Sequence, residues 1–303
     1  MRLLTADSWR YSDMKRFPAV LAAALFFAPL FAQTPIVGPD YGTPTRVAPE
    51  YFGPNAFPVP EMSDGKVKGR VYAELAGDYY NGSAADGNDH TCDVFIRLHV
   101  PLGERADLEV FGPMIEHWSY SPAVAAYRRI TTSDSKSWDS GDAYIGTNLQ
   151  FIKGRPNSLK PDLLVRAVLK TAMGNTFDQA RYYDAAGYYF DATFAWSRCF
   201  LESSYVREIR GGLSGGFLCW QDGLARQNDA VQYGLMAKMD ARHFLFTADF
   251  SGYSGWEKDG DCPVRLRLRA DGRIGAWRPF VQYVHGLRDY PFDGVRLGIA
   301  AEL

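Results

Sequence analysis

The amino-acid sequence predicts an all-β protein, a transmembrane antiparallel up-and-down β-barrel of about 12 strands. Three observations predict it. From residue 67 on, apolar and polar residues alternate with period two, which is typical of strands that have two different faces. The number of such segments is even, and long and short connections alternate between them. A soluble sandwich explains the first observation but has no reason to show the third.

The first 32 residues have the pattern of a secretory signal peptide. A short basic segment at 14–16 precedes an apolar run at 17–32, and Ala32 is a small residue at the cleavage position. We expect cleavage near Ala32, with residues 1–13 as an upstream extension and Met14 as the start. Export together with a barrel predicts the outer membrane of a Gram-negative cell.

Residues 33–66 are rich in proline and glycine and are predicted to be extended, because proline fixes φ and removes a backbone donor. The apolar residues Tyr51, Phe52 and Phe57 indicate that this segment docks on another part of the chain. We therefore expect a periplasmic arm or a partial plug of the barrel. Composition leaves a disordered linker open as the alternative.

Twelve strands are predicted over the barrel domain, residues 67–303. They are 67–80, 91–100, 106–119, 141–153, 161–172, 188–199, 205–219, 230–238, 242–252, 262–270, 274–286 and 293–302. Connections after odd strands contain 6 to 21 residues and those after even strands 3 to 7. Outer-membrane barrels combine long external loops with short periplasmic turns. We expect loop 120–140 to be external and mobile and the Asp-Gly turn at 271–273 to be periplasmic. Pro113 removes a ladder donor and predicts a bulge.

Charged residues at alternate positions are expected to line the barrel interior. In strand 262–270, Val264, Leu266 and Leu268 should face lipid while three arginines face a wet lumen. The same parity gives eight candidates for a solute path: Arg265, Arg267, Arg269, Arg296, Arg70, Glu74, Arg210 and Asp249. Inward bases and acids nearly balance. We therefore expect ion pairs across the lumen and a mild anion preference.

Two stretches, GDAYIGTNLQFIKG (141–154) and PDLLVRAVLKTAMGN (161–175), resemble outer-membrane barrel proteins of the Bacteroidetes type. More loosely, the chain is similar to the MetA-like family of outer-membrane transporters associated with phenol degradation. The resemblance covers most of 67–303 and lies in structural motifs. It implies diffusion or transport of a small compound and assigns no binding residues.

The leading expectation is a non-enzymatic channel for passive diffusion of a small solute, with outer-membrane lipid as its other partner and no cofactor. The formal net charge is −2 and no long basic run is present, so nothing points to nucleic acid. An outer-membrane lipid hydrolase is the alternative from another class. His285 near Asp289 would supply a base and an acid, but the flanking strands contain no serine nucleophile. His117 beside Glu116, with nearby loop serines, is a weaker candidate. A scaffold that makes contacts through loop 120–140 is the third possibility.

Four cysteines, Cys92, Cys199, Cys219 and Cys262, lack metal-ligand spacing, and we expect isolated thiols. The acidic loops at 86–93 and 257–262 carry oxygen ligands of the kind that Ca²⁺ prefers. Neither loop has a full ligand pattern, so ordinary turn chemistry is preferred and no metal site is predicted.

Overall fold

The computed structural model describes residues 47–303 apart from 131, 202–203, 222–226 and 257–259. The predicted signal peptide and the first part of the proline-rich segment lie outside the described residues.

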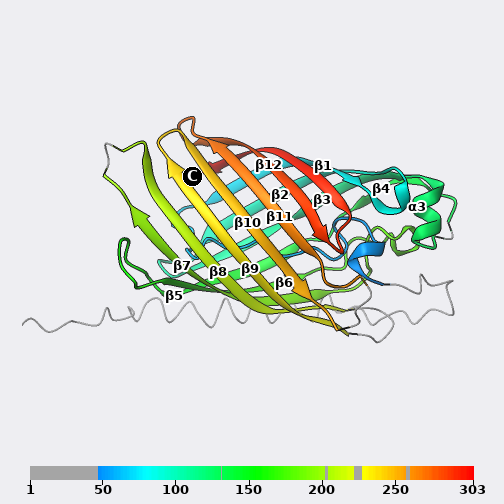
Figure 1. The fold of residues 1–303 in the computed structure, drawn as a ribbon, viewed down its shortest axis with the longest axis horizontal. Helices are drawn as coiled ribbons and strands as arrows, with labels where there is room; N and C mark the ends of the chain where they lie inside the picture. Colours follow the sequence, from blue (N-terminus) through cyan, green and yellow to red (C-terminus); the bar gives the residue numbers. More distant parts are fainter. Residues whose placement is uncertain (1–46, 131, 202–203, 222–226, 257–259) are drawn as a thin grey trace, which may run out of the picture. The chain divides into compact units, whose positions relative to one another are not determined.

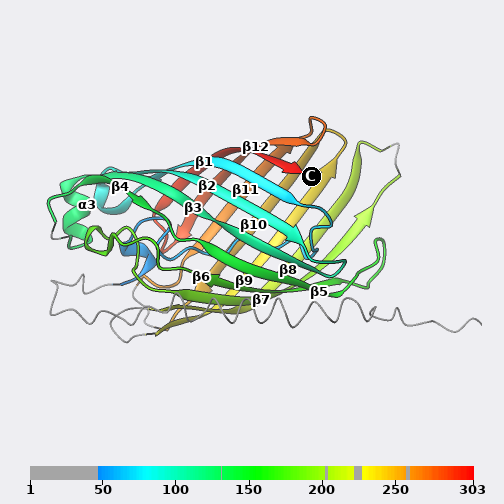
Figure 2. The ribbon, with the colours of Figure 1, turned by 180° about the vertical axis from the view of Figure 1, so that it is seen from behind.

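Within the described residues, twelve long antiparallel strands close into one barrel (Figures 1 and 2). They are β1 (Tyr72–Gly82), β2 (Asp89–Pro101), β3 (Ala106–Tyr120), β5 (Tyr144–Ile152), β6 (Asp162–Lys170), β7 (Gly187–Cys199), β8 (Val206–Gln221), β9 (Gln227–Ala241), β10 (Phe244–Ser254), β11 (Val264–Gly272), β12 (Trp277–Arg288) and β13 (Phe292–Glu302). Each strand pairs with its neighbours in sequence, and β13 pairs with β1 to close the ring. The predicted all-β barrel is confirmed.

The two faces of the barrel wall differ as the alternation predicts. On β1, Leu75 and Tyr79 are 53% and 45% exposed, whereas Glu74 and Asp78 between them are buried. On β11, Leu268 is 45% exposed and Arg265 and Arg267 are buried. An outer surface of large apolar side chains is typical of a barrel that crosses a membrane with its strands. No helix among the residues described here is long and apolar enough to span a membrane.

Two predicted boundaries are wrong. The first strand begins at Tyr72, so residues 67–71 do not belong to the wall. The predicted turn at 271–273 lies later, at 273–276, because Asp271 and Gly272 still pair within the sheet. Asp271 accepts hydrogen bonds from Arg269, which keeps this residue in strand β11.

The β2–β3 pairing contains the irregularity predicted at Pro113. The register shifts between Val94 and Phe95, which pair with Ile115 and Pro113 respectively. A bulge leaves one residue unpaired and removes the need for the donor that proline lacks. The bulge prediction is confirmed.

We call the end of the barrel that carries connections 83–88, 121–143 and 171–186 the loop end, and the opposite end the turn end. The asymmetry is weaker than predicted, since turn-end connection 153–161 is as long as loop-end connection 255–263.

The predicted loop 120–140 is partly regular at the loop end. It contains helix α3 (Pro122–Tyr127) and a short strand, β4 (Lys136–Ser140), which pairs only with β3. Ser121 caps α3 by accepting a hydrogen bond from the Val124 backbone N–H. Three-residue 3-10 helices lie at Pro49–Tyr51, Ala84–Asp86 and Phe177–Gln179.

Trypsin added to intact cells should cut at Arg129 or Lys136 and spare the turn at 273–276. Both side chains are exposed, whereas Arg128 is buried against Asp89. Mass spectrometry of the fragments gives the cleavage position. Cleavage only after permeabilisation would place the loop end in the periplasm.

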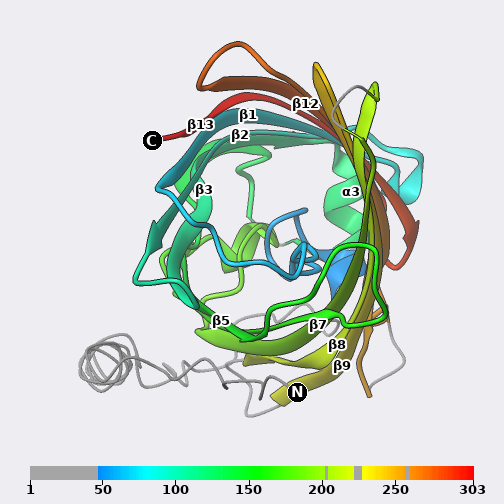
Figure 3. The same ribbon diagram turned by 90° about the vertical axis from the view of Figure 1, so that its left-hand side faces the viewer.

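Residues 47–71, which we call the inner segment, pass through the interior of the barrel (blue in Figure 3). Tyr51 contacts Tyr127 at the loop end. At the turn end, the Val67 N–H donates to Gln150, and the Val71 carbonyl accepts from the Leu303 N–H. The inner segment therefore runs along the barrel from the loop end to the start of β1.

Candidate functional site in the barrel lumen

The loop-end half of the lumen is filled by an apolar, largely aromatic cluster. Phe52 packs against Phe57 and Tyr183, with ring centroids 5.3 and 6.1 Å apart. The buried members from the inner segment are Ala48, Tyr51, Phe52, Ala56, Phe57 and Val59, and those from the barrel include Tyr144, Tyr189, Trp220 and Tyr253. The sequence prediction that this segment docks through its apolar residues agrees with these contacts.

A buried ionic cluster closes the loop end beside these rings. Arg181, from connection 171–186, forms ion pairs with Glu116 on β3 at 2.7 Å and with Asp89 on β2 at 3.2 Å. Arg128 forms an ion pair with Asp89, and all four side chains are fully buried. Asn55 of the inner segment donates to Glu116 at 2.8 Å. The cluster therefore ties a long connection, two strands and the inner segment together.

Arg181 stays charged in this cluster. Burial lowers the pKa of its guanidinium, but Glu116 and Asp89 raise it, and the resulting pKa lies above the ordinary value. The pKa of neighbouring Tyr182 is raised well above its usual range by burial and by Glu116, to which its hydroxyl donates. Tyr182 therefore remains a neutral donor at any ordinary pH.

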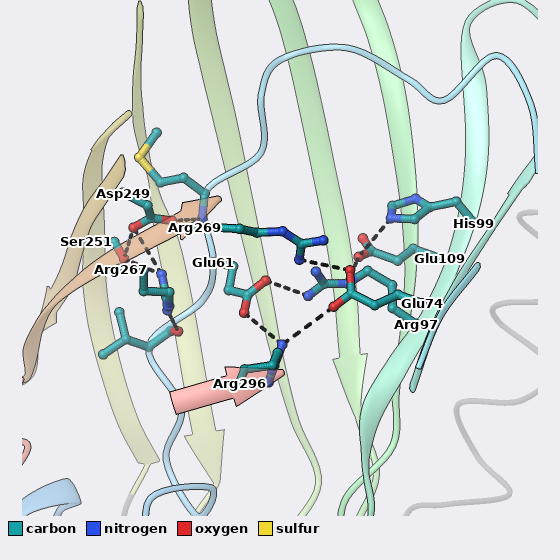
Figure 4. A network of polar contacts seen from close by, with 12 residues as sticks. Glu61, Glu74, Arg97, His99, Glu109, Asp249, Ser251, Arg267, Arg269 and Arg296 are labelled. Atoms are coloured by element: carbon teal, nitrogen blue, oxygen red, sulfur yellow. Dashed lines mark hydrogen bonds and ion pairs between the residues drawn. The ribbon is translucent and has the colours of Figure 1, made fainter. Parts of the chain in front are cut away.

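The middle of the lumen contains a network of arginines and acids around the inner segment (Figure 4). Arg97 on β2 lies 2.6 Å from the Glu61 carboxylate, and Arg296 on β13 lies 3.5 Å from it. Arg166 donates to the Glu61 carbonyl at 2.7 Å. Asp249 accepts from the Met62 N–H at 2.6 Å. Charged groups of the wall thus bind both the backbone and the one acidic side chain of this stretch.

The turn-end half of the lumen holds the inner segment in the same way. Lys238 lies 2.7 Å from the Asp64 carboxylate, and Arg210 donates to the Asp64 carbonyl at 2.6 Å. The Lys68 N–H donates to Asp107 at 2.7 Å. Polar contacts therefore follow the inner segment from Asn55 to Lys68.

Seven of the eight predicted path residues face the interior, and each has a partner there. Arg265 and Arg267 both donate to the Val59 carbonyl, and Arg267 also pairs with Asp249 at 3.0 Å. Arg269 pairs with Glu74 at 2.9 Å. The remaining interactions are those of Arg296 with Asp78 and of Arg210 with Asp162. The predicted arginine ladder is thus fully engaged with acids and with the inner segment.

Arg70 differs from the prediction. It precedes β1, and its side chain is exposed. The predicted strand included it because the alternation of Lys68 and Arg70 continues the pattern of β1 with the same parity.

The residue sets considered for a hydrolase do not assemble. His285 lies 2.6 Å from Asp293 rather than near Asp289, whose carboxylate accepts from the Cys262 N–H. His117 faces the backbone carbonyl of Ser137, while Glu116 points into the buried cluster. In the described part of the chain, no group of three or more His, Cys, Asp and Glu side chains is placed to hold a metal ion. The four cysteines are described as free thiols.

Comparisons with known proteins give structural neighbours only. No family model matches the chain, and no curated protein does, so the resemblance to MetA-like transporters and a Bacteroidetes origin stay predictions. The NanC porin aligns with a TM-score of 0.48 at 11% identity, over 76% of this chain and all of that chain. The KdgM porin aligns with a TM-score of 0.43 at 8% identity, over 76% of this chain and 99% of that chain. For Omp33 of Acinetobacter baumannii the values are 0.38 and 8%, over 77% of this chain and 98% of that chain.

Proposed function

We propose that this protein is a porin-like channel of the Gram-negative outer membrane for a small solute, closed in the state seen here by its own inner segment. The apolar outer wall supports the location, because large exposed apolar side chains on nearly every strand are suited to lipid. The observation that carries the channel proposal is the charged lumen. A wall of arginines and acids needs water or polar contents beside it, since lone buried charges are costly.

Displacement of the inner segment would open this lumen and change its charge. Glu61 and Asp64 would leave with the segment, while Arg97, Arg166 and Lys238 would remain on the wall. Arg265 and Arg267 would also lose the Val59 carbonyl. The open lumen is thus more positive than the closed one, which favours anions mildly because wall acids still neutralise part of the charge.

A non-transporting scaffold is the second candidate, and the loop end favours it. The aromatic cluster and the buried cluster around Arg181 resemble a permanently packed core rather than a hinged gate. In that case the inner segment is a structural part of the barrel and never leaves. Conductance separates the two candidates.

Deletion of residues 47–66 should convert a mostly closed barrel into one with steady conductance. The deletion removes Asn55, Val59, Glu61 and Asp64, to which the wall binds, and leaves all twelve strands in place. Single barrels of the full chain and of the deletion variant would be recorded in planar lipid bilayers. Heat-modifiable mobility in gels serves as the control for folding.

Two outcomes would count against the proposal. A folded deletion variant that does not conduct would support the scaffold. A full chain that conducts as steadily as the deletion variant would show that the inner segment does not close the lumen.

A further inference from the structure

The position of Glu61 carries a further inference, which rests on the proposed function and concerns the class of solute. Glu61 is the acidic residue of the inner segment at the centre of the network in Figure 4. Its carboxylate lies between Arg97 and Arg296, on the two strands that flank β1. The side chains of both arginines are nearly buried, with 13% and 7% exposure. Two cationic groups therefore converge on one carboxylate inside the lumen.

The wall itself holds these two guanidinium groups in place. Asp78 accepts two hydrogen bonds from Arg296, both of 2.6 Å, and this leaves Nη1 directed to Glu61 and Glu74. Arg97 lies 3.3 Å from Glu109 through Nε, while its Nη2 donates to Glu61. The Phe95 ring lies against both guanidinium groups, at 3.6 Å from Arg296 and 5.1 Å from Arg97.

This arrangement does not depend on Glu61. In each arginine, one edge of the guanidinium is fixed by a wall acid and by an aromatic ring, and the other edge is presented to the lumen. The pair is thus preorganised for a carboxylate, since guanidinium groups bind carboxylates through directed, charge-assisted hydrogen bonds.

We propose that Arg97 and Arg296 form a binding site for small carboxylate solutes, and that Glu61 occupies it as an internal ligand. A solute that bears a carboxylate competes with Glu61 and, by replacing it, loosens the inner segment. Neighbouring contacts extend the site, because Arg166 and Arg267 donate to the carbonyl oxygens of Glu61 and Val59. These donors suit hydroxyl or carbonyl oxygens next to the carboxylate of a solute.

Competition with a tethered group sets the expected affinities. A tethered carboxylate acts at an effective concentration in the millimolar range or above, so a free carboxylate binds the full chain weakly. Glu61→Gln removes the competing charge and keeps the length of the side chain. We expect gluconate to bind the purified Glu61→Gln barrel at least about tenfold more tightly than the unaltered barrel, as free ligand no longer competes with a tethered one.

Isothermal titration calorimetry in detergent, with gluconate as the probe, tests this. Sorbitol has the same carbon chain and no carboxylate, and it should not bind. Adding Arg97→Gln to Glu61→Gln should abolish gluconate binding. Glu50→Gln is the matched control, because Glu50 is an acid of the same segment that accepts from Tyr127 at the loop end, and it should leave the affinity unchanged.

The outcomes are decisive because heat-modifiable mobility shows which variants are folded. Folded Glu61→Gln that binds gluconate no more tightly than the full chain, or equally well without Arg97, overturns the proposal. The readout does not depend on conductance. A barrel that binds gluconate as expected but conducts in no form would end the channel proposal and leave the carboxylate site standing.

Discussion

Replacing Arg181 with methionine should lower the free energy of unfolding by about 3–5 kcal/mol, the usual cost of removing one partner from a buried ion pair. Arg181 is fully buried and bonds to Glu116, Asp89 and Thr91. Methionine fills much of the same volume but leaves Glu116 with only neutral donors, Tyr182 and Asn55. A carboxylate buried without its cation accounts for most of the expected loss.

Urea unfolding in lipid vesicles, followed by tryptophan fluorescence, measures this change. Trp118 is a local reporter, since the Arg181 guanidinium lies 6.0 Å from its ring centroid. Arg155→Met is the matched control, because Arg155 is exposed in a turn-end connection and should cost no more than about 0.5 kcal/mol. A loss below about 1 kcal/mol for Arg181→Met would mean that water reaches the cluster and replaces the guanidinium.

The barrel wall was predictable because each strand carries its own signal. Alternation assigns a residue to a face without knowledge of its neighbours, and so the inward position of Arg267 and the outward position of Leu268 both follow from β11 alone. The same property explains the error at the first strand. Residues 67–71 keep the alternation of β1, but they are bound by Gln150 and Asp107 inside the barrel instead of by a neighbouring strand.

The contents of the lumen were not predictable in the same way. Parity shows that Arg97 and Arg296 face inward, but their meeting at Glu61 depends on contacts across 36 and 235 residues of sequence. The usable signal was an acidic residue within an apolar, proline-rich stretch, because a charge that docks inside a barrel needs a counter-charge there. The pairing of His285 with Asp293 rather than Asp289 is similar, as it follows from the β12–β13 register.

Replacing Arg265, Arg267 and Arg269 with glutamine should lower the anion-to-cation permeability ratio of the open barrel. Alternate residues of a strand stand about 6.6–6.8 Å apart, so the three arginines form a ladder along one face. A unit charge about 7 Å from a passing ion in water changes its energy by about 0.6 kcal/mol, which is about threefold in local concentration. Asp249 and Glu74 offset part of this effect, so we expect about a threefold fall for the triple change rather than the product of three such factors.

The measurement belongs in the variant that lacks residues 47–66. In the full chain, Arg265 and Arg267 also hold the Val59 carbonyl, and their loss would release the inner segment as well as remove charge. Reversal potentials in a salt gradient give the ratio directly. Arg155→Gln in the same background removes a positive charge from an exposed connection and should leave the ratio unchanged. An open barrel whose ratio survives the triple change would show that these arginines serve only as partners of Asp249, Glu74 and the inner segment, and that ion selectivity is set elsewhere in the lumen.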